Sequence, residues 1–394
     1  MRIIAKENKF EIREIANYKS FLAMRESWNS ILLGNSRHTV FLTHEWFDAA
    51  WQWRKSTDEI CMLCTYSDSA LASVFPLVRT QAAGRFRTTE LRFLEVPDAQ
   101  ECDIVVADPD AEAAVAASIA HLAGQRDWDI AVFSKLEHDG NLSVNIEGAA
   151  AKAGLRSSKF TSGENPGVSL TGGWDAYYKS RSRRLKKGNN LIRNKLHANE
   201  NTVEVIRVGQ GDKSDVDQSS VLSTVIQISS SSWKADKGIT LDNPGPREFI
   251  IRLTEHASGN GWLSIWLLRL NGVFVAFEYQ LSFRGKISAL RSDYDPEYSA
   301  LSPGSYLNWC ILDKLFSTNS ELYRMGHGDN TYKLRWSNET SELAEVRLYN
   351  STVKGKVLWL TNEVVRPVLR RVKRQALRSF DALVGFTRVL IKRQ

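Results

Sequence analysis

Apolar residues recur along the first half of the chain at spacings typical of strands and helices. The alternation in Phe10–Ile15 predicts a strand, and the three- and four-residue spacing of Trp46, Ala49, Ala50 and Trp53 predicts a helix over His44–Arg54. Two further helices are expected, at Tyr18–Leu33 and Ala111–Leu122. Further strands are expected at Ile60–Tyr66, Ala72–Arg79, Thr89–Leu94, Ile104–Ala107 and Asp129–Ser134.

The second half repeats this order of elements. Its predicted helices are Trp174–Leu196, Val221–Ser231 and Pro246–Ser258, and its predicted strands are Thr202–Val208, Leu263–Leu270, Val273–Phe283 and Lys286–Ser292. Asn271-Gly272 predicts a hairpin turn, because both residues readily adopt positive φ.

The strongest linker signal in the middle of the chain is the glycine- and proline-containing segment 161–167. We therefore expect one domain over residues 1–165, a second over 166–350 and a basic tail over 351–394.

Composition indicates a folded protein of two ordinary cores, with 394 residues, 43% hydrophobic and 25% charged. No apolar run approaches the ~18 residues that span a bilayer, and the N-terminus lacks the order of a signal peptide. We expect a cytoplasmic location. Cys61 and Cys64 lie in an apolar run without a second cysteine pair, so they are interpreted as core residues and no metal is expected.

The positive charge of the chain is concentrated at its C-terminus. Eleven basic residues between Lys354 and Gln394 oppose only Glu363 and Asp381, a charge of +9 that leaves −2 for the rest. Apolar residues recur there at helical spacing, from Val365 to Val384. Two interpretations remain open: a helix lying on an anionic membrane, peripheral at the inner membrane face, or a helix docked on the body or on a partner protein.

A candidate anion site begins at Ser302, where a predicted strand and turn lead into a helix. Ser302 is a suitable N-cap, Pro303 fits the first helical position, and Gly304 lets a ligand approach the backbone. The free amides as far as Ser305 and the positive helix end favour a phosphate.

Two other groups carry candidate acid–base chemistry. Alternation in Val273–Phe283 turns Glu278 and Gln280 to the face opposite the apolar one. Glu278 is interpreted as a candidate general base, whereas Gln280 is expected on a solvated outer face. The glycine-rich loop before Trp336 gathers four polar residues that either perform chemistry or organise the turn: His327, Asp329, Tyr332 and Lys333.

These segments resemble the GNAT acyltransferases, in particular the CelD-like branch of bacterial cellulose and exopolysaccharide synthesis. The Tyr-Asp-Pro turn of that branch corresponds to 294–296, its Ser-Pro-Gly to 302–304, and its loop ending in Tyr-Lys to 326–333. The usual Arg/Gln-x-x-Gly-x-Gly/Ala loop is absent, and only Gly304 remains of its glycines. The resemblance covers residues 170–345 and extends loosely to the first half through Phe41–Trp46 and Trp51.

The resemblance implies an α/β (α+β) fold of tandem GNAT-like domains, each a mixed, mostly antiparallel sheet flanked by helices. It implies an acyl-CoA-dependent N- or O-acyltransferase acting on a cell-surface saccharide or its precursor, with acetyl-CoA or a longer acyl-CoA as co-substrate. The implied residues are Ser302, Pro303, Gly304 and Ser305 for the acyl-CoA; Glu278, Asp329, Tyr332 and Lys333 for catalysis; and Trp233, Lys234 and Tyr294 for the acceptor.

Two alternatives remain. The basic cluster Arg181–Lys187 is reminiscent of Fem-type aminoacyltransferases, tandem GNAT proteins that use aminoacyl-tRNA, although the chain lacks the aromatic-interleaved pattern of an RNA-reading module and nucleic acid is not the expected partner. The second alternative is a non-catalytic scaffold that holds a membrane polysaccharide synthase through residues 351–394.

Overall fold

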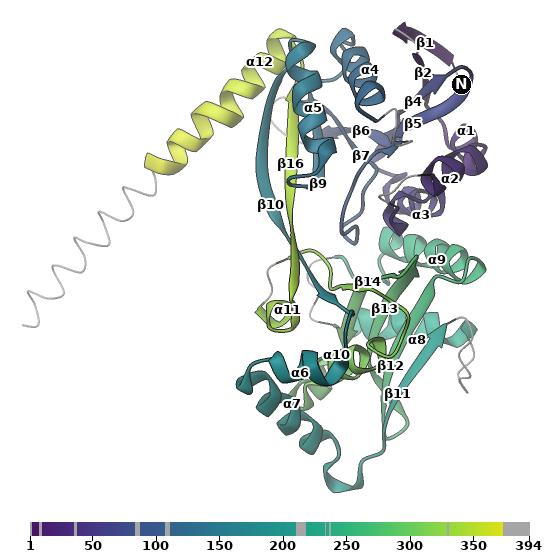
Figure 1. The fold of residues 1–394 in the computed structure, drawn as a ribbon, viewed down its shortest axis with the longest axis vertical. Helices are drawn as coiled ribbons and strands as arrows, with labels where there is room; N and C mark the ends of the chain where they lie inside the picture. Colours follow the sequence, from purple (N-terminus) through teal and green to yellow (C-terminus); the bar gives the residue numbers. More distant parts are fainter. Residues whose placement is uncertain are drawn as a thin grey trace, which may run out of the picture.

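The structure is a computed structural model (Figure 1) that describes residues 2–7, 10–34, 38–82, 87–106, 111–209, 218–232, 234–235, 238–328 and 331–372. Strands of the first half are β1 (Arg2–Glu7), β2 (Phe10–Ile15), β3 (Asp58–Ile60), β4 (Met62–Ser67), β5 (Ala70–Phe75), β6 (Leu77–Ala82), β7 (Thr88–Phe93), β8 (Val105–Val106), β9 (Ile130–Glu137) and β10 (Arg156–Ser169). Its helices are α1 (Tyr18–Leu22), α2 (Arg25–Leu33), α3 (His44–Arg54), α4 (Ala111–Gly124) and α5 (Asn141–Lys152), with a short 3₁₀ turn, η1 (Val40–Leu42).

Strands of the second half are β11 (Val203–Gly209), β12 (Leu263–Leu270), β13 (Val273–Phe283), β14 (Lys286–Tyr294), β15 (Leu322–Arg324) and β16 (Glu339–Tyr349). Its helices are α6 (Trp174–Ser180), α7 (Arg183–Leu196), α8 (Gln218–Ser231), α9 (Pro244–Gly259), α10 (Pro303–Leu315), α11 (Thr331–Trp336) and α12 (Val353–Trp359). Short 3₁₀ segments are η3 (Ala198–Glu200) and η5 (Pro296–Leu301), and a π-helical turn, η6 (Leu360–Val365), continues α12.

The strands form two sheets. The smaller has the order β1-β2-β4-β5-β8, and the larger has the order β11-β12-β13-β14-β15-β10-β16-β9-β7-β6-β3. Among the strands that the structure describes, only β14 with β15 and β7 with β9 pair in parallel. Helices cover the sheets, as Figure 1 shows. The predicted fold class, an α/β fold with mixed and mostly antiparallel sheets flanked by helices, is confirmed.

The larger sheet is continuous through both halves of the chain. Strand β10 pairs with β16 from Arg156 opposite Tyr349 to Gly167 opposite Glu339, while β9 of the first half pairs with the other edge of β16. The predicted linker over 161–167 is therefore wrong, because these residues lie inside β10 and their ladder partners are far away in sequence. The predicted domain boundary at 165/166 falls inside the same strand and stays a prediction.

Several local predictions can be checked against the backbone. The hairpin turn at Asn271-Gly272 is confirmed, with φ of 49° and 84°. The helix predicted over Tyr18–Leu33 is divided into α1 and α2, and the one over Trp174–Leu196 into α6 and α7. The second division occurs because Ser182 is extended, and its hydroxyl accepts a hydrogen bond from the Leu185 amide to cap α7.

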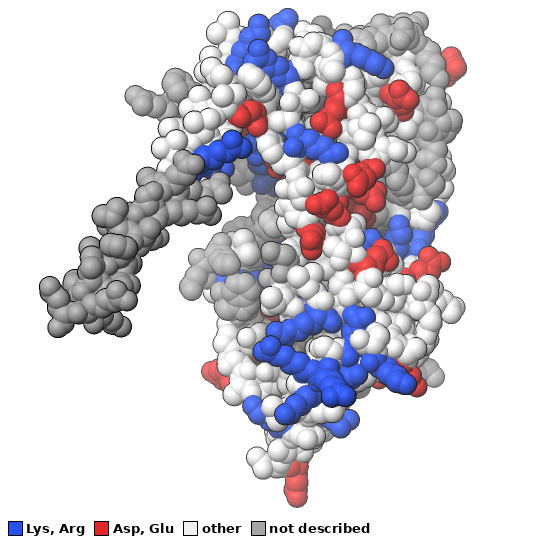
Figure 2. Space-filling view, turned by 60° about the vertical axis from the view of Figure 1, so that its left-hand side comes forward, with Lys and Arg blue, Asp and Glu red and all other residues white. Residues whose placement is uncertain are grey.

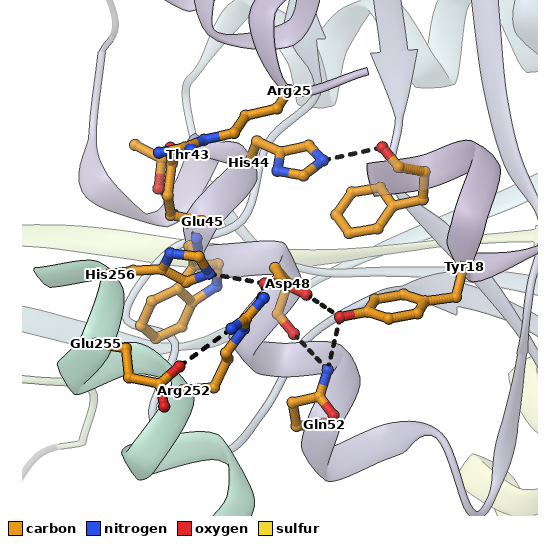
Figure 3. Close-up of polar contacts among 12 residues, drawn as sticks. Tyr18, Arg25, Thr43, His44, Glu45, Asp48, Gln52, Arg252, Glu255 and His256 are labelled. Atoms are coloured by element: carbon orange, nitrogen blue, oxygen red, sulfur yellow. Dashed lines mark hydrogen bonds and ion pairs between the residues drawn. The ribbon is translucent and has the colours of Figure 1, made fainter. Parts of the chain in front are cut away.

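Helices α3 and α9, from the two halves, pack against each other around Asp48 (Figure 3). Arg252 Nε and His256 Nε2 each lie 2.7 Å from Asp48 Oδ2, and the Tyr18 hydroxyl donates to Oδ1. Burial raises the pKa of Asp48, but hydrogen bonds from His256, Tyr18 and Arg252 outweigh burial and lower this pKa to about 2. The ionised carboxylate therefore ties α9 to α3.

The C-terminal helix projects from the body beyond α12, at the upper left of Figure 1. Part of the predicted tail domain, residues 373–394, lies outside the described residues. Within the described part of the chain, no helix is long and apolar enough to cross a membrane.

Replacing Asp48 with asparagine should lower the free energy of unfolding by about 2 kcal/mol at pH 7, since a shift from 3.8 to about 2 corresponds to that free energy. Because the pKa is lower in the folded state, this stabilisation is complete above pH ~4 and is lost as the pH falls toward 2. Urea unfolding of both proteins between pH 2 and 7 measures this difference in the free energy of unfolding.

The matched control is Glu255→Gln, which removes the exposed partner of Arg252 in the same network. It should lower the free energy of unfolding by less than ~0.5 kcal/mol. A difference between parent and Asp48→Asn that does not depend on pH would contradict the assignment.

Candidate functional site

The main cavity opens where the parallel strands β14 and β15 separate. The two strands pair only from Lys286 opposite Leu322 to Ser288 opposite Arg324. Beyond this point their continuations, residues 289–294 and 325–327, line a cavity of about 520 Å³. The separation leaves the edge of β14 unpaired with β15 along the cavity.

The cavity is lined from both faces of the sheet. On one face, α7 and α10 contribute Arg184, Gly188 and Asn308, and this face packs the core around Tyr306 and Ile311. On the other face, where α8 and α9 pack, the segment 97–99 and Lys234 contribute. Two molecules that approach from opposite faces can therefore meet at the gap between β14 and β15.

Glu278 is a buried carboxyl group held at this gap. It is 4% exposed and lines the cavity. Its Oε1 accepts hydrogen bonds from the Tyr323 hydroxyl at 2.6 Å and from Gln280 Nε2 at 2.7 Å. Burial raises the pKa of Glu278, and the hydrogen bonds from Tyr323 and Gln280 oppose this rise without cancelling it.

Gln280 does not lie on a solvated face, so that expectation is wrong. The side chain is fully buried, and its Oε1 accepts from Trp266 Nε1 at 2.9 Å and from the Ser264 hydroxyl at 3.2 Å. The polar face of β13 is covered by α10, which packs against this strand. Gln280 therefore fixes the orientation of Glu278 through a chain of hydrogen bonds.

Lys333 secures the loop on the other side of the cavity. Its Nζ donates to the carbonyl oxygens of Gly326 at 3.0 Å and His327 at 3.1 Å. Burial and the nearby Lys234 lower the pKa of Lys333 to about 8, while Glu278 opposes this shift. The carbonyl groups that Lys333 holds belong to the continuation of β15, so this lysine sets the width of the gap.

Tyr332 also lines the cavity. Although 44% of Tyr332 is exposed, partial burial of its phenol, with a contribution from the neighbouring Glu278, raises the pKa of Tyr332 to about 12. The phenol is therefore protonated at neutral pH and can donate a proton.

The predicted anion site lies at the start of α10. Gly304 and Ser305 line the cavity, whereas Ser302 and Pro303 are not among its lining residues. Ser302 occupies the N-cap position, but the prediction that its hydroxyl caps the helix is wrong. Its backbone is left-handed, with φ of 54°, instead of the extended conformation from which a capping side chain reaches the first turn.

Two of the residues predicted to bind the acceptor, Tyr294 and Lys234, line the cavity from different sides. Tyr294 packs with the core around α10, whereas Lys234 Nζ is 2.6 Å from the buried Asp293 Oδ1 on the charged side. A second buried pair joins Arg291 Nε to Asp98 Oδ2 at 2.7 Å. Trp233 and Asp329, both predicted site residues, lie outside the described residues.

Sequence reasoning missed Tyr323 and Asn308. Tyr323 lies in a strand of three residues, too short for a periodic signal, and contacts Glu278 only through the fold. Asn308 Nδ2 lies 3.4 Å from the Tyr323 hydroxyl. Asn308 follows Gly304 by four residues, so the two residues lie on the same side of α10. This spacing could have identified Asn308 from the sequence.

Replacing Tyr323 with phenylalanine should raise the pKa of Glu278 above its already raised value, because the carboxylate loses a donor that favours its charged form. Carbon-13 NMR of the side-chain carboxyl, assigned with Glu278→Gln, measures the titration. Tyr298→Phe in η5 serves as the control and should leave it unchanged. A Glu278 pKa that is unchanged or lower in Tyr323→Phe would show that Tyr323 does not stabilise the carboxylate.

Comparisons with known proteins agree with this geometry. Residues 186–334 match the acetyltransferase (GNAT) domain family. The crystal structure of FemX is similar with a TM-score of 0.58 at 10% identity, covering 89% of this chain and all of FemX. The C-terminal domain of a protein described as a lysylphosphatidylglycerol synthetase, from Agrobacterium fabrum, gives 0.51 at 15% identity, covering 86% of this chain and 95% of that domain.

A tandem GNAT protein from the clavulanic acid biosynthesis pathway is also similar, with a TM-score of 0.47 at 9% identity, covering 86% of this chain and 98% of its own. No curated protein sequence matches the chain. The comparisons therefore show two things: residues 186–334 are similar to the acetyltransferase (GNAT) domain family, and the chain shares its fold with FemX.

Proposed function

We propose that this protein transfers an acyl group from acyl-CoA directly to an amine or hydroxyl group of a cell-surface saccharide or its precursor. One observation carries the proposal. The cavity between β14 and β15 is lined from both faces of the sheet and contains the buried carboxyl group of Glu278. Donor and acceptor can enter from opposite faces and react without a covalent enzyme intermediate.

The start of α10 supports binding of the donor. Gly304 and Ser305 line the cavity there, and no acidic residue lies in the first turn of the helix. The positive end of the helix and its amides favour a pyrophosphate. The edge of β14 beyond Ser288 supplies backbone groups that can hold and polarise the thioester carbonyl.

In the proposed reaction, the acceptor nitrogen or oxygen attacks the thioester carbonyl carbon and loses its proton to Glu278. The C–S bond then breaks, and the departing CoA thiolate takes a proton from Tyr332. The raised pKa of Glu278, caused by burial, brings this base closer to neutrality, where general bases are most effective. Asp329, which lies outside the described residues, remains a second candidate base.

A route through a cysteine has little support. Cys310 is the cysteine that belongs to α10, beside the cavity. Burial raises the pKa of its thiol to about 11, so the nucleophilic thiolate is scarce at neutral pH. This favours direct transfer.

The charged side of the cavity supports a polar acceptor. The pairs Lys234–Asp293 and Arg291–Asp98 present both donors and acceptors of hydrogen bonds within a few residues of Glu278 along β13 and β14. Hydroxyl and amino groups of a sugar match such a lining.

A second candidate, an aminoacyl-tRNA donor, is favoured by the surface of α7. Figure 2 shows basic side chains gathered on the lower half of the molecule, where α6 and α7 lie. Exposed basic residues of α7 include Arg183, Arg184 and Arg193, and Arg184 also lines the cavity. A tRNA bound to this basic helix would place its aminoacyl end near the gap between β14 and β15.

Glu278→Gln should lower kcat/KM for acyl transfer by roughly 10²–10⁴, because the amide cannot accept the acceptor's proton. Release of free CoA thiol from acetyl-CoA, with amino sugars and neutral sugars as acceptors, measures the rate. Affinity for acetyl-CoA should stay near that of the parent. Glu321→Gln, an exposed glutamate outside the cavity, is the matched control. A Glu278→Gln enzyme that retains the parent's rate would remove Glu278 as the base.

Gly304→Val should weaken acetyl-CoA binding at least tenfold, because a branched side chain would fill the start of the cavity. A Cβ at this glycine meets only Tyr294 Cδ1, at 3.4 Å, so the helix tolerates the change. Calorimetry with acetyl-CoA, a longer acyl-CoA and aminoacyl-tRNA measures binding. Gly148→Val, at an exposed helical glycine with nothing within 4 Å of its Cβ, controls for the substitution itself.

Equal acetyl-CoA affinity of parent and Gly304→Val would contradict the donor site at α10. Binding of aminoacyl-tRNA without binding of either acyl-CoA would favour the second candidate.

A further inference from the structure

We propose that the helical segment after β16, residues 353–372, is a membrane anchor that lies on an anionic lipid surface and holds the enzyme there. The inference is independent of the proposed acyl transfer, because it depends only on this segment and is tested by binding. Two observations support it: the start of the segment is packed against the body, and the segment exposes large apolar and basic side chains.

One side of the segment is packed against the body. The Gly355 amide donates to the Thr352 hydroxyl at 3.1 Å, and a Cβ at Gly355 would lie 2.2 Å from the Asn350 carbonyl oxygen. Leu358 and Trp359 pack against the core formed by Ile130, Val132 and Tyr349. The Arg156 guanidinium lies 4.0 Å from the centre of the Trp359 ring. The start of the helix is therefore held at a defined position on β9 and β16.

The other side exposes large apolar residues that no described part of the chain covers. Their exposed fractions range from 40% to 81%, for Val353, Val357, Leu360, Val364, Val365, Val368, Leu369 and Val372. The segment leaves the body over this length (Figure 1). Within the described residues, the apolar core of the body packs against the segment only near Leu358 and Trp359, so this apolar side is left open to an external surface.

The charges of the segment identify the surface that it fits. The segment contains one acid, Glu363, which accepts a hydrogen bond from Tyr349, and five basic residues, Lys354, Lys356, Arg366, Arg370 and Arg371. Lys354 pairs with Asp129 of the body at 2.6 Å, so the proposed lipid contact depends on the other four. From Val364 onward, helical spacing places five apolar residues, Val364, Val365, Val368, Leu369 and Val372, on one side and Arg366 and Arg370 on the other. A basic amphipathic helix of this kind lies at the lipid interface, with its arginines among anionic headgroups.

A second copy of the chain is a poorer occupant. Packing two such faces together would bring the arginines of both helices close to each other, whereas anionic headgroups neutralise them. The segment has too few consecutive apolar residues to span the bilayer. In agreement, the described part of the chain contains no helix that could cross a membrane.

Sedimentation of the full chain with vesicles tests the anchor. We expect the protein to pellet with vesicles that contain phosphatidylglycerol, to remain in solution with pure phosphatidylcholine, and to be released as salt rises. Arg366→Glu, Arg370→Glu and Arg371→Glu combined should lower the partition coefficient roughly 100-fold or more, since each basic residue near the surface contributes roughly fivefold. Val364→Ser, Val368→Ser and Leu369→Ser combined should also abolish pelleting.

The matched control reverses three exposed lysines elsewhere, Lys19, Lys152 and Lys314, and should pellet like the parent. Light scattering of the same proteins reports their oligomeric state. The proposal is overturned if the parent does not pellet, if the segment variants pellet as the parent does, or if the control loses binding equally. It is also overturned if the serine variant converts a dimer to a monomer while lipid binding persists, because the apolar face then serves a second copy.

Discussion

The pairing of β10 with β16 is the interaction on which the rest of the structure depends. These strands, separated by most of the second half in sequence, pair from Arg156 opposite Tyr349 to Gly167 opposite Glu339, with one shift of register between Thr161 and Gly163. Through them, strands of both halves join in the larger sheet. The pairing also places the segment 97–100 beside β14, where Gln100 Nε2 donates to the Ala289 carbonyl oxygen at 2.7 Å. One wall of the cavity therefore comes from the first half of the chain.

Buried charges set the chemistry that this sheet can support. Glu278 is kept in a site where burial disfavours its ionised form, and Tyr323 and Gln280 recover part of the lost stabilisation. Burial thus moves the pKa of this carboxyl group upward from its ordinary value. Asp48 is the opposite case, because its donors outweigh burial and keep it ionised as a fixed tie between α3 and α9. The pKa values of two buried acids therefore shift in opposite directions because their donors differ, which suits the proposed reactive role of Glu278 and the structural role of Asp48.

The proposed anchor and the proposed reaction share the same sheet. The anchoring helix follows β16 directly, and Leu358 and Trp359 pack on residues of β9 and β16. A membrane that holds this helix therefore also restricts how the cavity is presented, because no long linker separates them. Such an arrangement suits an acceptor attached to, or released near, the membrane surface. The basic surface of α7 would add to the same electrostatic attraction if it faces the lipid.

The sequence by itself determined most local elements and some of the residues that line the cavity. Short-range periodicity identified the strands β12 to β14 and the helix that begins at Pro303, and local residue chemistry identified Glu278, Gly304 and Lys333 as cavity residues. Tertiary structure decided the rest. Glycine and proline in 161–167 indicate a linker locally, but pairing with β16 makes them a strand. The burial of Gln280 depends on α10, and Tyr323 reaches Glu278 only because distant strands are neighbours. Local spacing reports what a segment can form, whereas the partner that covers or pairs it is chosen by contacts across the whole chain.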